Sequence, residues 1–187
     1  MVKDIRINVK SISFGSEDIE LIFGDIVIPF YASYIGPEPI STLIDSLIAL
    51  EVELIENADQ CYNVAWADEP GYLSLDMWKK KESDILHLEV EYNNEGDGIY
   101  HKEEKWEFEL SYQCYRKAII NESIRLLKQY GLDGYNRNWC HGNDTFPLNS
   151  LLILLGNTSL FDQEKECSYS DIFSELRLLK EALRKTD

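Results

Sequence analysis

Apolar and polar residues alternate along the middle of the chain. A period of two sends neighbouring side chains to opposite faces of a strand. The alternation therefore predicts antiparallel strands, each with one buried face and one face in water. Four segments show this pattern: residues 61–67, 72–79, 85–92 and 101–115.

The N-terminal part also has strand character. Residues 3–14 follow a period of about two with a slip near Ser11, which predicts a strand with a bulge. Residues 19–31 are rich in β-branched and aromatic side chains and are interrupted by Gly24 and Pro29. We expect either one long strand or two short strands, bent at Gly24.

At two places the apolar residues follow the spacing of a helix. Ile40, Leu43, Ile44, Leu47 and Ile48 form an apolar stripe, so a helix should begin near Pro39 and end near Glu51. A second helix is predicted over 116–130, with Gly131 as its end. Beyond it we expect an irregular segment at 131–147, a short apolar helix to Leu155 and a last helix that begins at Ser170.

This order of elements predicts the α+β class, with a mainly antiparallel sheet, helices packed on one face, and C-terminal helices. The length of 187 residues suits one domain with a full apolar core. We expect residues 1–115 to be mostly strands with one helix, and residues 116–187 to be mostly helical.

Charge is the unusual feature of the composition. The formal net charge is −16, and residues 11–78 contain no Lys or Arg but thirteen acidic residues. Such a surface disfavours nucleic acids and anionic membranes as partners. It is explained either by solubility or by a surface that meets a cationic partner. The first residues do not read as a signal peptide and the four cysteines are widely spaced, so we expect a cytoplasmic protein without disulfides.

The polar faces of the predicted strands carry the candidate binding residues. If 85–92 and 101–115 form a hairpin, Glu89 and Glu91 lie near Glu107 and Glu109. Like charges directly opposed destabilise a sheet. Three readings remain: a solvated face, a docking face for a basic protein, or paired carboxylates for acid/base catalysis.

The predicted irregular segment offers the one candidate nucleophile. It contains Cys140, His141 and Asp144, residue types that together can activate a thiolate. Residues adjacent in sequence usually point apart, so a structural loop is the simpler reading. The three histidines have no chelating spacing, and no phosphate-binding glycine motif occurs. We therefore expect no metal and no cofactor.

The segment Trp66-Ala67-Asp68-Glu69-Pro70-Gly71-Tyr72, the alternating strands up to Tyr115 and the acidity of 11–78 resemble bacterial immunity proteins of polymorphic-toxin and contact-dependent growth inhibition systems. The resemblance implies a non-catalytic protein that binds one cognate, basic, nuclease-like toxin in a 1:1 complex. The alternatives are another acidic protein-interaction or regulatory module, and an enzyme that uses the 131–147 segment. The residues we expect to bind the partner are Glu53, Glu56, Asp59, Asp68, Glu69, Asp76, Glu89, Glu91, Glu107 and Glu109, with Tyr72 and Trp78 as aromatic anchors.

Overall fold

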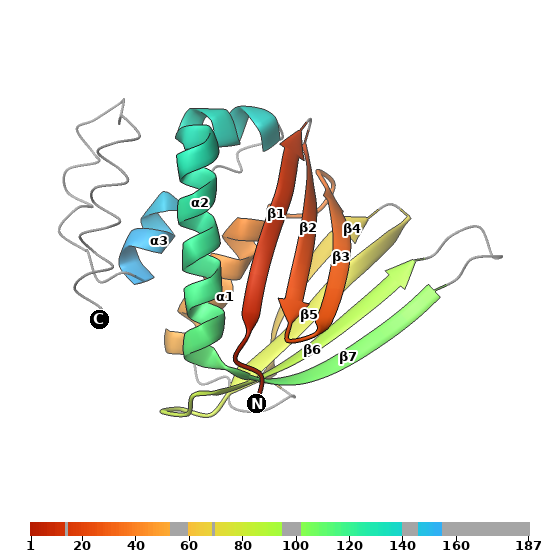
Figure 1. Ribbon diagram of the computed structural model, residues 1–187, viewed down its shortest axis with the longest axis vertical. Helices are drawn as coiled ribbons and strands as arrows, with labels where there is room; N and C mark the ends of the chain where they lie inside the picture. Colours follow the sequence, from red (N-terminus) through yellow and green to blue (C-terminus); the bar gives the residue numbers. More distant parts are fainter. Residues whose placement is uncertain (14, 53–59, 69, 95–101, 140–145, 155–187) are drawn as a thin grey trace.

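In the residues that it describes, the computed structural model has two antiparallel sheets and three helices (Figure 1). It describes residues 1–13, 15–52, 60–68, 70–94, 102–139 and 146–154. The predicted α+β class with C-terminal helices is confirmed, and the strands divide into two sheets. One sheet holds β1 (Ile5–Ser13), β2 (Ser16–Phe23) and β3 (Ile26–Ser33), and the other holds β4 (Tyr62–Asp68), β5 (Gly71–Lys79), β6 (Ile85–Asn94) and β7 (Lys102–Ser111). The helices are α1 (Pro39–Val52), α2 (Tyr112–Trp139) and α3 (Leu148–Leu154).

The two sheets pack on each other through aromatic side chains. The ring centroids of Phe23 and Phe108 are 4.6 Å apart, and those of Phe30 and Trp66 are 5.9 Å apart. The chain start also joins the layers, because Val2 forms a bridge with Leu110 on β7. In Figure 1 the three-stranded sheet lies in front and the four-stranded sheet behind it.

Helices cover the rest of the inner face of the four-stranded sheet. The indole of Trp66 donates a 2.9 Å hydrogen bond to Thr42 on α1. The hydroxyl of Tyr115 on α2 lies 3.2 Å from the sulfur of Met77. Trp66 and Met77 are fully buried. The sheet therefore has one face inside the core, and its opposite face is the one left for solvent or a partner.

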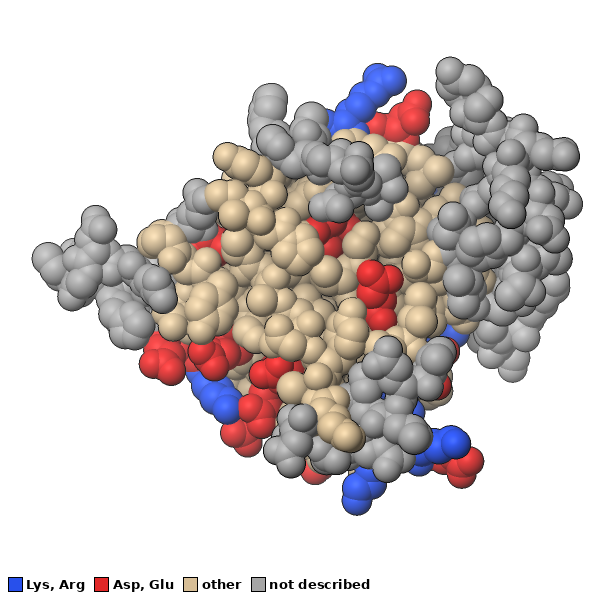
Figure 2. All heavy atoms as spheres, turned by 180° about the vertical axis from the view of Figure 1, so that it is seen from behind, with Lys and Arg blue, Asp and Glu red and all other residues tan. Residues whose placement is uncertain are grey.

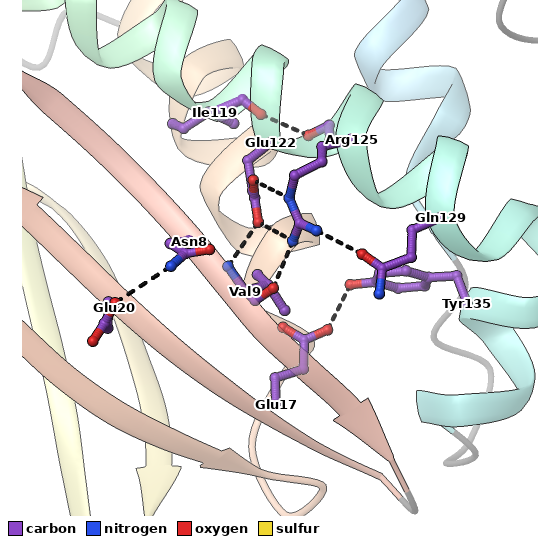
Figure 3. Close-up of polar contacts among 10 residues, drawn as sticks. Asn8, Val9, Glu17, Glu20, Ile119, Glu122, Arg125, Gln129 and Tyr135 are labelled. Carbon is purple, nitrogen blue, oxygen red and sulfur yellow. Dashed lines mark hydrogen bonds and ion pairs between the residues drawn. The ribbon is translucent and has the colours of Figure 1, made fainter.

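The predicted bulge in the first strand is confirmed. The register of β1 against β2 shifts between Val9 and Ser11. Glu122 on α2 accepts a 2.7 Å hydrogen bond from the backbone N–H of Val9, and Arg125 donates a 2.5 Å bond to the carbonyl of Val9 (Figure 3). Arg125 also pairs with Glu122 at 2.6 Å. The pair satisfies the backbone at the bulge and fixes α2 against β1.

The segment around Gly24 forms a hairpin, so the prediction of two short strands holds. Gly24 adopts φ 62° in the turn between β2 and β3, a left-handed conformation that favours glycine. The first helix also follows its prediction, since α1 runs from Pro39 to Val52. Glu51 places a carboxylate in the last turn of α1, where it opposes the helix dipole, and the guanidinium of Arg116 lies 3.1 Å from it.

The predicted strand over 101–115 is wrong at its end, because β7 stops at Ser111 and α2 begins at Tyr112. Ser111 accepts a 3.3 Å hydrogen bond from the N–H of Cys114, and Asp84 accepts a 2.9 Å bond from the N–H of Gln113. These caps satisfy free N–H groups at the helix start. Apolar and polar residues continue to alternate after Ser111, but the capping hydrogen bonds favour a helical backbone from Tyr112 onward.

The predicted irregular segment at 131–147 is also wrong in its first half. Gly131 breaks the helix as expected, with φ 68° and ψ 170°, but helical structure resumes and reaches Trp139. Tyr135 and Trp139 are one helical turn apart, and both are buried. Their burial holds this second piece of helix against the sheet.

Several predictions fall outside the described residues: the loop residues Cys140, His141 and Asp144, and the helix expected from Ser170. Within the part of the chain that the structure describes, no helix is both long enough and apolar enough to cross a membrane.

Candidate partner-binding face

One face of the four-stranded sheet points away from the core and carries most of the predicted binding residues. Trp78 pairs with His87, Asp76 with Glu89 and Ser74 with Glu91 along β5 and β6. Alternation places all of these side chains on the face opposite the buried Leu75 and Met77. We call this surface the acidic sheet face; its residues are Tyr72, Ser74, Asp76, Trp78, His87, Glu89, Glu91, Lys105, Glu107 and Glu109.

The register between β6 and β7 shows how the predicted like charges are arranged. Glu91 lies opposite Lys105, and His87 lies opposite Glu109. Glu89 and Glu107, however, are directly opposed. Side chains paired in this way are about 5 Å apart at Cβ, so the two carboxylates repel each other. Asp76 on β5 also lies directly opposite Glu89, so the sheet keeps two unfavourable pairs around Glu89 at the centre of its exposed face.

Among the residues that the structure describes, Lys105 is the basic side chain on the acidic sheet face. Its Nζ lies 2.7 Å from an oxygen of Glu89, and this bond raises the pKa of the lysine. Half of the Lys105 side chain, 51%, remains exposed. Among the described residues, Glu107 and Glu109 form no ion pair, and both are exposed. The face consequently presents carboxylates that can still accept hydrogen bonds from a partner.

Both predicted aromatic anchors lie on this face and are half-buried. The rings of Trp78 and His87 stack, with centroids 5.3 Å apart and planes 9° apart. The hydroxyl of Tyr72 donates a 3.0 Å hydrogen bond to Glu91. The aromatic rings are thus held in place by their neighbours and offer preorganised surface to a partner.

The face is hollowed beside the aromatic stack. A pocket of about 280 Å³ opens there, lined by Trp78, His87, Leu88, Glu89, Glu107, Phe108 and Glu109. This volume lies just below the range of about 300–1,000 Å³ that is typical of drug-sized ligands. The pocket is therefore suited to a single side chain.

Figure 2 shows the molecule from behind, the side on which the four-stranded sheet lies. Acidic side chains gather at the lower left, where β6 and β7 are seen from this side, with Lys or Arg among them. Much of the remaining described surface in this view is uncharged. The negative charge on this side gathers at the lower left, and further acidic side chains stand apart in the middle of the view, at its top and at its lower right.

The structure separates one predicted residue from the others. Asp68 shares a side of β4 with the buried Val64 and Trp66 and accepts a 3.3 Å hydrogen bond from Tyr92. Partial burial raises its pKa. Asp68 therefore belongs to the inner side of the sheet. Glu53, Glu56, Asp59 and Glu69 lie outside the described residues.

A second acidic cluster, which sequence reasoning missed, is buried. Glu17 on β2 and Glu38 before α1 are 0% and 1% exposed. The hydroxyl of Tyr135 on α2 lies 2.7 Å from Glu17 and also hydrogen-bonds to Glu38. Figure 3 shows the tyrosine reaching from α2 to Glu17 on the sheet. The cluster ties three elements together inside the core.

The buried cluster differs chemically from the acidic sheet face. Glu38 accepts hydrogen bonds from the N–H groups of Ile40 at 2.8 Å and Ser41 at 2.5 Å, so it caps α1. Burial, and next the negative charge of Glu38, raise the pKa of Glu17 well above its ordinary value. The second oxygen of Glu17 has no hydrogen-bond partner among the described residues. The cluster can hold a proton, but its burial gives a protein partner no access.

Comparison with known proteins adds no relative: no family model, no curated protein and no solved structure matches the chain. The geometry of the acidic sheet face is therefore the basis for inferring a function.

Proposed function

We propose that this protein is a non-catalytic immunity protein that binds and neutralises a basic protein toxin through the acidic sheet face. The observation that carries the proposal is that Glu107 and Glu109, which form no ion pair with any residue that the structure describes, share one open face with the ordered Trp78–His87 stack. Carboxylates of this kind attract a cationic partner from a distance and raise the rate of association. Aromatic side chains then supply the contacts that become desolvated in the complex.

The opposed Glu89 and Glu107 favour a binding role over simple solubility. Acidic residues that serve only solubility gain nothing from being directly opposite each other, because repulsion costs stability. A cation placed between them by a partner would remove this cost. Residues that lower stability in the free protein are expected at functional sites.

Growth rescue tests the proposal. Each protein encoded beside this gene in its native genome is expressed in a sensitive host, with and without this chain. We expect one neighbour to arrest growth and this chain to restore it. A fourfold charge reversal, Glu89, Glu91, Glu107 and Glu109 to Lys, should abolish the rescue.

The matched control reverses four exposed acids elsewhere: Asp4, Asp25, Glu82 and Asp133 to Lys. This control variant has the same net charge as the test variant and should still rescue growth. Equal rescue by both variants would contradict a role for the acidic sheet face. A neighbour that binds this face without inhibiting growth would favour the alternative, a regulatory interaction module.

A further inference from the structure

We infer that the pocket on the acidic sheet face binds an arginine side chain of the protein partner. The inference rests on the proposed function and names the group that the site recognises. It starts from the composition of the pocket, which combines the carboxylates of Glu89, Glu107 and Glu109 with the stacked rings of Trp78 and His87.

The positions of the carboxylates suit a group with several donors. Glu107 and Glu109 are two residues apart on one strand, about 7 Å between Cα atoms, and point to the same side. Glu89 approaches from the neighbouring strand. A guanidinium carries five N–H donors in one plane and can bridge carboxylates that a compact ammonium group meets singly.

The internal lysine leaves room for this partner. Lys105 lies opposite Glu91 in the register and reaches Glu89 at 2.7 Å. Glu107 lies directly opposite Glu89 and Glu109 lies opposite His87, and among the described residues neither of these two pocket carboxylates forms an ion pair. A cationic side chain of the partner would therefore complement the charge of these two carboxylates.

The aromatic wall distinguishes arginine from lysine. A planar guanidinium stacks on an aromatic ring, and a cation over a ring gains attraction from the ring's negative face. Trp78 and His87 stack with their planes 9° apart, so each ring supports the other and the outer face of the stack offers a flat, ordered surface. A flat wall beside carboxylates matches the shape of a guanidinium.

Peptide titration tests this inference without the natural partner. The probes are Gly-Gly-Arg-Gly-Gly and the same peptide with lysine or citrulline at the centre, each followed by NMR of the full chain. We expect the indole signal of Trp78 to shift with the arginine peptide, with affinity about three- to tenfold above that for citrulline and clearly above that for lysine. Glu107→Gln should lower the affinity for the arginine peptide about threefold or more, whereas Glu103→Gln, at the far end of the same strand, should leave it unchanged.

The two proposals fail separately. Equal affinity for arginine and citrulline would overturn the arginine pocket, while growth rescue could still depend on the acidic sheet face. Equal affinity for arginine and lysine would likewise reject guanidinium recognition. An arginine-selective pocket in a protein whose rescue survives the fourfold reversal would uphold this inference and overturn the proposed function.

Discussion

Replacing the buried Glu17 by glutamine should change how stability depends on pH. The hydroxyl of Tyr135 has one hydrogen but contacts both Glu17 and Glu38. Glu38 already accepts two backbone N–H groups, as an ionised cap does. The contacts are all satisfied if Glu17 keeps its proton and donates it to Tyr135, while Tyr135 donates to Glu38.

The size of the effect follows from proton linkage. In the unfolded chain a glutamic acid has a pKa of about 4.3, and burial raises the pKa of Glu17 well above its ordinary value in the folded protein. Between these two values the unfolded state releases the proton and the folded state retains it. The contribution of Glu17 is therefore complete below about pH 4.3. It then falls by about 1.4 kcal/mol per pH unit until the folded protein also releases the proton.

Urea unfolding of wild type and Glu17→Gln at about pH 5, 6 and 7 measures this slope. Glutamine cannot titrate, so the free energy of unfolding of the variant minus that of wild type should rise with pH, by up to about 1.4 kcal/mol per pH unit while the folded protein keeps the Glu17 proton. Glu82→Gln, at an exposed position, is the matched control and should follow wild type. A difference between Glu17→Gln and wild type that stays constant with pH would show that Glu17 is ionised when folded, and would refute the reasoning.

Three further predictions concern other contacts. Arg125→Ala should lower the free energy of unfolding by about 2 kcal/mol, because it leaves the buried carboxylate of Glu122 without its ion pair; urea unfolding against Arg137→Ala, an exposed ion pair, measures this. Ser111→Ala should cost about 1 kcal/mol by removing the cap of α2, as seen in the thermal midpoint. Glu107→Gln should raise the free energy of unfolding by about 0.2–1 kcal/mol, since it relieves the repulsion from Glu89, while weakening partner binding. A Glu107→Gln variant that is less stable than wild type would contradict this view of the opposed pair.

Periodicity predicted the strands well because one face of each strand is buried. β5 and β6 match their predicted segments closely, since Leu73, Leu75 and Met77 face the core and their neighbours face solvent. The predicted secondary structure is wrong where contacts between residues distant in sequence determine the backbone conformation. Asp84 and Ser111 begin α2 within an alternating segment, and burial of Tyr135 and Trp139 extends helical structure past Gly131.

The distribution of charged residues in the sequence predicted the acidic sheet face only in part. The sequence placed Glu89 and Glu107 on one surface correctly, because side-chain parity follows from alternation. The same count treated Glu17 and Glu38 as surface charge, and the structure buries both. Burial of an acid depends on a partner distant in sequence, here Tyr135, and a single sequence carries no signal for such a partner.

The rate of association with the growth-inhibiting neighbour, measured by stopped flow at increasing salt concentration, tests the role of the acidic sheet face most directly. The account predicts that the rate constant falls steeply as ionic strength rises, and that the fourfold reversal to lysine removes both the fast association and its salt dependence. The variant reversed at Asp4, Asp25, Glu82 and Asp133 should associate nearly as wild type does. A rate constant that is the same at low and high salt, or unchanged by reversing the acidic sheet face, would contradict the account.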